Sequence, residues 1–415
     1  MQKRVMDRFL AHGVKTGASD LHFLVGDRPS YRIDGKLRPV KYEPLSPADT
    51  RQICENLVEG SLDFPLEEVQ EHDCSYSVEG VARFRVNIYR QRGSLCCVLR
   101  VIPSKIPKLE ELGLPERISQ LADEERGLVL VTGATGSGKS STLAAMIRHI
   151  NQTRAAHILT IEDPIEFLHS NAQSSISQRE VGPDTKSFTT ALRSSLRQDP
   201  DVILVGEMRD PETIDIALKA AETGHMVFST VHTTDAAKTV GRLVSMFPTE
   251  EQPTARIRLA DNLRGVISQR LLPRADGKGR VVAAEVMVAT KTVQEHIKDP
   301  EKTGQLNDVI ERGRDQYGMQ SFDQHLTDLY RAGTISIEVA MAAASNPSDF
   351  ERALHFSEAS GDGDAPGAAT DLSTATFNLE AEKPADGDSL FEEIDDGLGT
   401  DAAPEDENIL ELVER

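Results

Sequence analysis

The sequence predicts an α/β protein in which a mostly parallel sheet covered by helices follows a small α+β domain. Between residues 127 and 288, short apolar runs alternate with segments whose apolar residues recur at helical spacing, which is typical of a parallel sheet with crossover helices. The first hundred or so residues instead hold short strand candidates separated by turn residues. After Phe356 the chain becomes acidic and rich in Gly, Pro and Ala, a composition that cannot build a hydrophobic core.

A chain of 415 residues is long enough for two or three domains. Changes in composition and the prolines near residue 105 suggest where these domains begin and end. We expect an N-terminal domain at 1–103, a linker at 104–112, the larger α/β domain at 113–356 and an acidic disordered tail at 357–415.

The N-terminal domain is predicted to contain one helix at its start and a second between two groups of strands. Asp34-Gly35 is a strong signal for a tight hairpin turn. The expected elements are a helix over 5–14 that leads into 18–23, strand candidates around the turn within 30–37, a helix over 47–58, and paired strands over 83–89 and 94–102.

The larger domain shows the alternation most clearly. Its expected strands are 127–132, 157–162, 201–206, 226–231 and 281–288, and its expected helices are 140–152, 187–198, 211–223 and 235–246. From about residue 254 onward, the pattern becomes mainly helical and ends near Phe356.

The charge of the chain is concentrated at its C-terminal end. The formal net charge is −21, and the residues after Phe356 include 18 acidic and two basic ones. The rest is only mildly acidic and lacks clustered Lys and Arg, so we expect no nucleic-acid partner. Two apolar groups interrupt the tail and are either docking motifs that fold on an unknown partner or incidental residues of a solvated segment: Leu390, Phe391, Ile394 and Leu398, then Ile409, Leu410, Leu412 and Val413.

The sequence predicts a cytosolic protein that can dock on a membrane complex. Its apolar runs are shorter than the roughly 18–20 residues that span a bilayer, and the charged start lacks the apolar core of a signal peptide. Cys54, Cys74, Cys96 and Cys97 form no C-x-x-C pair, so we expect reduced thiols and neither a zinc site nor a redox motif.

The strongest motif is a phosphate-binding loop. Its eight residues fit G-x-x-x-x-G-K-[ST], and the motif lies between a predicted strand and a predicted helix, which is the context that the pattern requires. Backbone N–H groups of such a loop surround phosphate oxygens, the lysine reaches the β- and γ-phosphates of ATP, and the serine hydroxyl binds Mg²⁺. The residues are Gly133, Ala134, Thr135, Gly136, Ser137, Gly138, Lys139 and Ser140.

Two carboxylates follow predicted strands that end near this loop. Glu162 ends the 157–162 strand and is a candidate ligand of Mg²⁺ or its waters; an ordinary acidic turn before Pro164 is the alternative. Glu207 follows four apolar residues, and Gly206 occupies the place of the usual aspartate of a Walker B strand. Glu207 is therefore the candidate that orients the water attacking the γ-phosphate.

Histidines and distant arginines complete the set of candidates. His232 lies beyond the end of the 226–231 strand, where a γ-phosphate sensor is expected, whereas His225 precedes that strand and equally fits a structural role. Arg85 and Arg100 lie in the N-terminal domain. Because few arginines lie near the phosphate loop, a neighbouring subunit is a plausible source of the arginine that neutralises charge during phosphoryl transfer; surface ion pairs are the alternative.

In order and wording, these segments closely resemble the type IV pilus retraction ATPases, the PilT/PilU branch of the secretion ATPase superfamily. The resemblance covers residues 1 to about 355. Its motifs are Gly17–His22, Arg83–Asn87, Gly127–Ser140, Ile161–Phe167, Gln178–Val181, the Glu207 segment, the His225–His232 box and Tyr317–Asp323.

The resemblance implies a PAS-like domain joined to a RecA-like ATPase domain, assembled as a homohexamer at the cytoplasmic side of the inner membrane. It places Glu162 in the "Asp box", makes Glu207 the catalytic glutamate, and matches Arg85 and Arg100 to arginine fingers that complete the site of another subunit. It places His225 and His232 in the His box. Expected partners are other copies of the chain, the inner-membrane pilus platform protein and, as a candidate, a second retraction ATPase.

The implied function is an ATP-hydrolysing motor for pilus retraction and twitching motility. The Ala-Ile-Arg-like motif of retraction enzymes is replaced here by Thr292–Asp299, which leaves open an accessory, PilU-like role. Assembly and secretion ATPases of the same fold are a second alternative, although the four-cysteine metal motif common in extension ATPases is missing from the sequence. An ATP-binding scaffold that recruits a partner through its tail is the third.

Overall fold

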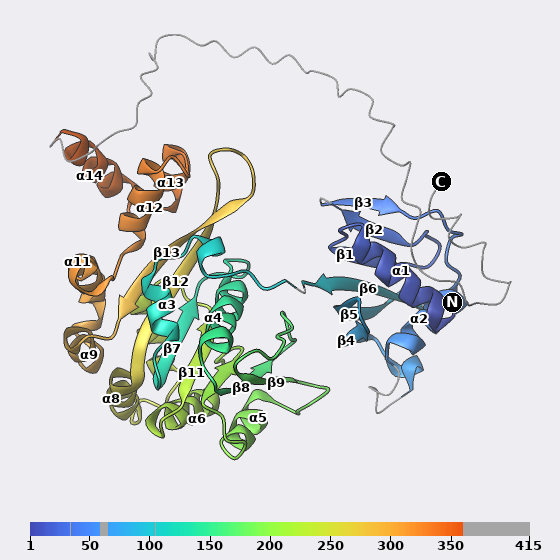
Figure 1. The fold of residues 1–415 in the computed structure, drawn as a ribbon, viewed down its shortest axis with the longest axis horizontal. Helices are drawn as coiled ribbons and strands as arrows, with labels where there is room; N and C mark the ends of the chain where they lie inside the picture. Colours follow the sequence, from blue (N-terminus) through green and yellow to red (C-terminus); the bar gives the residue numbers. More distant parts are fainter. Residues whose placement is uncertain (34, 59–64, 104, 360–415) are drawn as a thin grey trace, which may run out of the picture. The chain divides into compact units, whose positions relative to one another are not determined.

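The computed structural model describes residues 1–33, 35–58, 65–103 and 105–359 (Figure 1). It contains two compact units, which divide between Val101 and Ile102. The predicted acidic tail lies outside the described residues from Ser360 onward, as does Asp34 of the predicted hairpin turn. Within the part that is described, no helix is long and apolar enough to cross a membrane.

The N-terminal unit is a six-stranded sheet with the strand order β3-β2-β1-β6-β5-β4 and two packed helices. The apolar residues of β5 alternate, so that Phe84, Val86 and Ile88 face the core while Arg85 is exposed. The bounds are α1 Lys3–Lys15, β1 Asp20–Phe23, β2 Ser30–Ile33, β3 Lys36–Pro39, α2 Pro47–Leu57, η1 Leu66–Glu68, β4 Glu71–Val78, β5 Ala82–Gln91 and β6 Ser94–Ile102.

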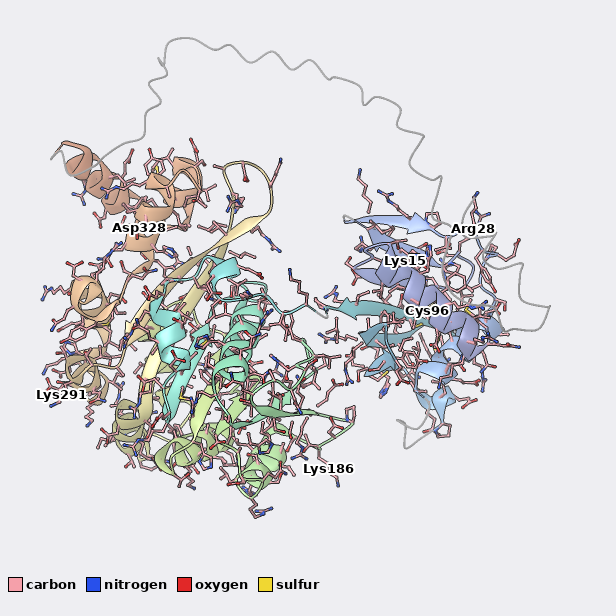
Figure 2. The ribbon with its side chains drawn as sticks, viewed as in Figure 1. Lys15, Arg28, Cys96, Lys186, Lys291 and Asp328 are labelled. Atoms are coloured by element: carbon pink, nitrogen blue, oxygen red, sulfur yellow. The ribbon has the colours of Figure 1, made fainter. Side chains whose placement is uncertain are left out.

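All the helices and strands predicted for this unit are present, and β4 is an additional edge strand. Its segment alternates poorly because polar residues occupy both faces, so its sequence gives little strand signal. The four cysteines are buried and form no disulfide among the described residues, and Cys96 lies on β6 (Figure 2).

The second unit contains a seven-stranded sheet with the order β13-β12-β7-β11-β10-β8-β9. Neighbouring strands from β12 to β9 are parallel, and only β13 is antiparallel to its neighbour. The strands are β7 Gly127–Thr132, β8 His157–Glu162, β9 Ser175–Glu180, β10 Val202–Val205, β11 Met226–Val231, β12 Leu263–Pro273 and β13 Arg280–Val288.

Helices cover both faces of this sheet (Figure 1). Leu128 and Leu130 of β7 pack on one layer, which includes α6 and α7, whereas Val129 and Val131 pack on the other, with α3 and α4. The helical segments are η2 Glu110–Leu112, α3 Arg117–Ala122, α4 Lys139–Thr153, α5 Phe188–Ser195, α6 Pro211–Glu222, α7 Ala236–Ser245, α8 Gln252–Asn262, α9 Lys291–Lys298, η3 Thr303–Gln305, α10 Leu306–Arg312, α11 Arg314–Tyr317, α12 Phe322–Arg331, α13 Ile337–Ala343 and α14 Pro347–Ala359.

The predicted alternation is confirmed, and the bounds of β7, β8 and β11 agree with the prediction residue for residue. The prediction of a mainly helical pattern from residue 254 onward is wrong for β12, an eleven-residue strand. This strand is paired on both sides and covered on both faces, so polar residues such as Ser268 and Gln269 are buried in it and disturb the pattern that sequence reading depends on.

The residues that follow β6 and precede β7 in the sequence belong to the second unit. Leu109 is buried in the core that contains α4, and the Arg148 side chain of α4 donates a hydrogen bond to the Ile106 carbonyl. Exposed lysines such as Lys186 and Lys291 lie at the surface of the same unit (Figure 2).

Candidate active site

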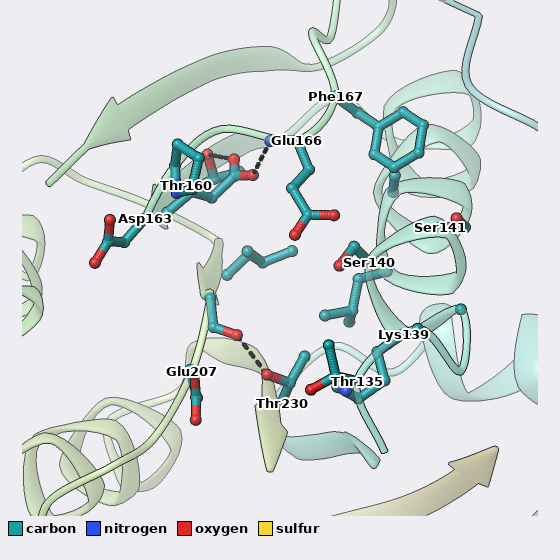
Figure 3. Close-up of a pocket in the computed structure, with 18 of the residues that line it drawn as sticks. Thr135, Lys139, Ser140, Ser141, Thr160, Asp163, Glu166, Phe167, Glu207 and Thr230 are labelled. Carbon is teal, nitrogen blue, oxygen red and sulfur yellow. Dashed lines mark hydrogen bonds between the residues drawn. The ribbon is translucent and has the colours of Figure 1, made fainter. Parts of the chain in front are cut away.

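A cavity of about 410 Å³ opens where β7, β8, β10 and β11 end at the phosphate loop. Ligands of parallel α/β sheets bind at this carboxyl edge because the connecting loops meet there. Figure 3 shows Lys139 and Ser140 on one side of the cavity and Glu207 on another. Eight of the predicted site residues line this cavity: Thr135, Gly136, Gly138, Lys139, Ser140, Glu162, Glu207 and His232.

The backbone of the loop is shaped for an anion. Gly133, Gly136 and Gly138 all have positive φ angles, of 144°, 79° and 94°. A Cβ atom on Gly133 would come within 2.5 Å of the Gln269 carbonyl oxygen, so only glycine fits there. The chain therefore turns back on itself directly before α4, as a phosphate cradle requires.

The start of α4 leaves donors available for phosphate. Gly138 is its N-cap residue, and no described side chain caps the helix there. The Ser137 hydroxyl is buried and has no hydrogen-bond partner within the described chain. Unsatisfied N–H groups and the positive end of the helix dipole favour an oxyanion at this position, so the residues present fit a bound nucleotide phosphate.

Lys139 is held by the loop itself. Its Nζ atom donates hydrogen bonds to the Gly133 and Ala134 carbonyl oxygens, each at 3.0 Å, and its side chain is buried. Burial lowers the pKa of Lys139, and the negative charges of Glu207 and Glu166 oppose that effect. A phosphate in the cradle would supply the charge partner that the carbonyl dipoles supply only in part.

β12 contacts both elements that flank the phosphate loop, β7 and α4. This strand was not predicted from the sequence. The Gln269 side-chain amide donates to Thr142 of α4 at 2.8 Å, and the Thr132 hydroxyl donates to Ser268 at 3.1 Å. Ser268 lies directly opposite Thr132 in the parallel register of β12 and β7. The adjacent polar residues Ser268 and Gln269, which follow Val266 and Ile267, were the available signal, because buried polar groups must be paired.

Glu162 is fixed at the end of β8 by three hydrogen bonds. Its Oε1 atom accepts from the Thr160 hydroxyl at 2.6 Å and from the Gln178 amide at 3.1 Å, and its Oε2 accepts from the Glu166 backbone N–H at 3.4 Å. Burial raises the pKa of Glu162, while the Thr160 and Gln178 hydrogen bonds lower it. Gln178 comes from β9, an edge strand that sequence reasoning did not predict.

Glu207 lies between two cationic or titratable partners. Its Oε2 atom is 2.7 Å from Arg209, and its Oε1 is 3.4 Å from Nε2 of His232. The Thr230 hydroxyl donates to the Gly206 carbonyl at 2.6 Å, which ties the turn bearing Glu207 to β11 (Figure 3). Glu207 follows β10 and His232 follows β11, so the two side chains meet at the same edge of the sheet although 25 residues separate them in sequence.

His225 is not brought into this cavity. It precedes β11, and its Nδ1 atom lies within hydrogen-bond distance of the Ala220 carbonyl oxygen and the Thr223 hydroxyl. At this opposite edge of the sheet, the His225 carbonyl accepts a hydrogen bond from the Gly127 N–H. Six strand residues separate the two histidines, about 20 Å at the rise of a strand. His225 is therefore not among the residues that line the cavity, whereas His232 is.

Arg85 and Arg100 belong to the N-terminal unit, whereas the phosphate loop belongs to the second. Arg100 pairs with Asp20 of the adjacent strand at 2.9 Å, and 68% of its side chain is exposed. Among the described residues, no hydrogen bond or ion pair is formed by the exposed Arg85 guanidinium. Both guanidinium groups are thus accessible on the sheet that carries them.

Glu166 and Arg280 also line the cavity, and neither was singled out from the sequence. Across the residues with a described placement, no group of three or more His, Cys, Asp or Glu side chains is arranged to hold a metal ion. Ser140 and Glu162, the predicted Mg²⁺ ligands, both line the cavity, as do the carboxylates of Asp163, Glu166 and Glu207. Oxygen atoms of this kind suit a hard cation such as Mg²⁺, which commonly takes its remaining ligands from nucleotide phosphates and water.

Comparison with known proteins agrees with this geometry. The family model described as Type II/IV secretion system protein matches residues 1–358. The type IV pilus retraction ATPase PilT of Pseudomonas aeruginosa is 48% identical over 341 residues, which are 82% of this chain and 98% of that protein. The type IV pilus ATPase PilU of the same organism is 41% identical over 347 residues, 83% of this chain and 89% of that protein.

A solved structure supports the same assignment. The crystal structure of the pilus retraction motor PilT with bound ADP has a TM-score of 0.77 and 44% sequence identity, and the match covers 84% of this chain and 99% of that one. Sequence and fold therefore agree over nearly the whole length of these relatives. The chain belongs to the pilus retraction ATPases, the PilT/PilU branch of the Type II/IV secretion system proteins.

Proposed function

We propose that this chain hydrolyses ATP as one subunit of a homohexameric ring, and that the ring powers type IV pilus retraction and twitching motility. The observation that carries the proposal is the position of Glu207. Its carboxylate shares one cavity with Lys139 and Ser140 of the phosphate loop and lies 3.4 Å from His232. The assignment of this motor to pilus retraction is supported by the membership of the chain in the pilus retraction ATPase family.

In this proposal the phosphate loop binds the ATP phosphates through its N–H groups and Lys139. Lys139 exchanges its contacts with the Gly133 and Ala134 carbonyls for phosphate oxygens. Ser140 and Glu162 would hold Mg²⁺ or its waters, and the ion would supply positive charge that offsets the charge on the phosphates. The remaining work belongs to side chains of the protein, because phosphoryl transfer depends on positioning and charge stabilisation.

Glu207 orients the water that attacks the γ-phosphorus. The bond between that water oxygen and phosphorus forms while the bond to the leaving oxygen of ADP breaks. Arg209 and His232 hold the two carboxylate oxygens of Glu207 in place. His232, which lines the same cavity, acts as the sensor of the γ-phosphate. Arg85 and Arg100 of a neighbouring subunit supply positive charge to the transition state.

The ring acts at the cytoplasmic face of the inner membrane on the pilus platform protein, and hydrolysis moves pilin subunits back into the membrane. An accessory role beside a second retraction ATPase is the alternative, because the Ala-Ile-Arg-like motif of retraction enzymes is replaced at Thr292–Asp299, which covers most of α9. Recruitment of a regulator through the acidic tail is a separate part of this proposal.

Deletion of the gene, scored by imaging fluorescent pili, separates these functions. We expect pili that still extend but no longer retract, with retraction restored by the wild-type gene and not by Lys139→Ala. Loss of all surface pili would instead indicate an assembly motor. Retraction that persists at lower force would indicate the accessory role, and an unchanged pilus phenotype would contradict the proposal.

A further inference from the structure

Glu285 of β13 is a buried carboxyl group that has no role in the proposed hydrolysis mechanism. Only 3% of the residue is exposed, and no described ion pair involves its side chain. A buried carboxyl group is costly unless hydrogen bonds compensate it. Its contacts therefore indicate what the fold uses it for.

The Glu285 carboxylate joins two elements of the active site through its Oε1 atom. This oxygen accepts a hydrogen bond from the Ala236 backbone N–H at 2.7 Å and one from the Ser268 hydroxyl at 3.3 Å. Ser268 lies directly opposite Glu285 in the register of β12 and β13, and it also accepts from the Thr132 hydroxyl at 3.1 Å. A continuous hydrogen-bonded chain thus runs from Thr132 to Ala236 through four elements: β7, β12, β13 and α7.

The two ends of this series of hydrogen bonds, Thr132 and Ala236, lie close in sequence to the phosphate loop and to His232. Thr132 is the last residue of β7 and immediately precedes Gly133, the first glycine of the phosphate loop. Ala236 is the first residue of α7 and follows His232 by four positions. The short loop between them is held further by Thr233, whose hydroxyl contacts Thr239 at 2.7 Å. The place of Ala236 therefore limits where His232 can lie.

We propose that Glu285 is a positioning residue for ATP hydrolysis, which fixes the loop of His232 relative to the phosphate loop and so keeps His232 beside Glu207. It acts through Ser268 and Ala236 and touches neither nucleotide nor water. This inference rests on the proposed function, in which Glu207 and His232 act at the γ-phosphate.

The charge state of Glu285 gives the inference a pH signature. Burial and the negative charge of Asp235 raise the pKa of Glu285 to about 7, while the Ala236 and Ser268 hydrogen bonds and the positive charge of Arg270 oppose that shift. An ionised carboxylate accepts the Ala236 N–H more strongly than a protonated one, and it favours the positive end of α7. We therefore expect kcat to rise with pH through a limb near pH 7.

The test is steady-state ATP hydrolysis by the full chain between pH 6 and 8.5. Glu285→Gln keeps an acceptor for Ala236 but does not titrate, so it should retain kcat within about 3-fold and lose the limb. Glu285→Leu leaves a buried N–H and a hydroxyl unpaired, and should lower kcat by about 10-fold with little change in the KM for ATP. Glu311→Gln, which changes an exposed carboxyl on α10, is the matched control and should behave as wild type.

Wild-type kcat in Glu285→Leu, or a limb that persists in Glu285→Gln, would overturn the inference. If Glu285→Leu does not fold, Glu285→Gln and Ser268→Ala decide, and Ser268→Ala should lower kcat by about 3-fold or more because it interrupts the same chain. Glu207→Gln, assayed in parallel, separates the two claims. Its normal turnover would refute the catalytic assignment, whereas its inactivity combined with wild-type behaviour of the Glu285 and Ser268 variants would refute only the role of Glu285.

Discussion

Arg209 forms an ion pair with Glu207, with 2.7 Å between Nη2 and Oε2, immediately after β10 ends at the cavity. The hydrogen bond to Glu207, together with the negative charge of that carboxylate, raises the pKa of Arg209. His232 holds the other oxygen of the same carboxylate at 3.4 Å. The carboxylate that is proposed to orient water is therefore itself oriented from two sides.

Arg209→Ala should lower kcat modestly and leave the KM for ATP nearly unchanged. Because 68% of the Arg209 side chain is exposed, its pair with Glu207 is worth about 0.2–1 kcal/mol, which corresponds to a loss of roughly 1.5- to 5-fold. Steady-state kinetics checks this, with Arg193→Ala as the control, since Arg193 forms a comparably exposed pair with Glu212 and does not line the cavity. A loss of 100-fold would mean that Arg209 contacts the nucleotide directly.

Mixing inactive subunits should restore activity if arginines act between subunits. Arg100→Ala subunits keep an intact phosphate loop, and Lys139→Ala subunits keep Arg100, so a mixed ring contains complete sites. We expect ATP turnover of the mixture to exceed the sum of the two separate preparations. Arg38→Ala, a substitution of an exposed residue on β3, should hydrolyse ATP normally by itself. Strictly additive rates in the Arg100 mixture would contradict a shared site.

The thermal stability of the protein should depend on pH through the ionisation of the buried acid Glu285. Its folded pKa of about 7 lies above the ordinary value of 4.5, so the stability that its protonated form contributes is present below pH 4.5 and is lost as the pH rises through 7. Glu285→Gln does not titrate and should gain stability relative to wild type between pH 5 and pH 8, by roughly 1–3 kcal/mol. Melting temperatures across this range measure it. A constant difference between the two proteins at all pH values would place the pKa of Glu285 outside the range.

The sequence predicts the parts of this molecule where pattern and burial agree. The β7 run is apolar from Leu128 to Val131 and leads directly into the phosphate loop, so both its bounds and the position of Lys139 could be read from the chain. Glu207 and His232 could be placed because each follows a buried parallel strand, and the ends of such strands meet at one edge.

The supporting residues could not be predicted, for a physical reason. Ser268, Gln269 and Glu285 lie within strands covered on both faces, where the apolar pattern predicts hydrophobic residues. Their meaning depends on cross-strand neighbours, such as Thr132 opposite Ser268, which sequence spacing does not specify. His225 shares a predicted motif with His232, but the β11 strand lies between them and only His232 lines the cavity.

The most direct test of the account is ATP hydrolysis and nucleotide binding by Glu207→Gln, compared with Lys139→Ala. Glu207→Gln keeps the size of the side chain and the phosphate loop, so it should bind ATP and ADP nearly as wild type while turnover falls by about 100-fold or more. Lys139→Ala should lose both binding and turnover. Turnover near the wild-type rate in Glu207→Gln would contradict the central claim that this carboxylate orients the attacking water.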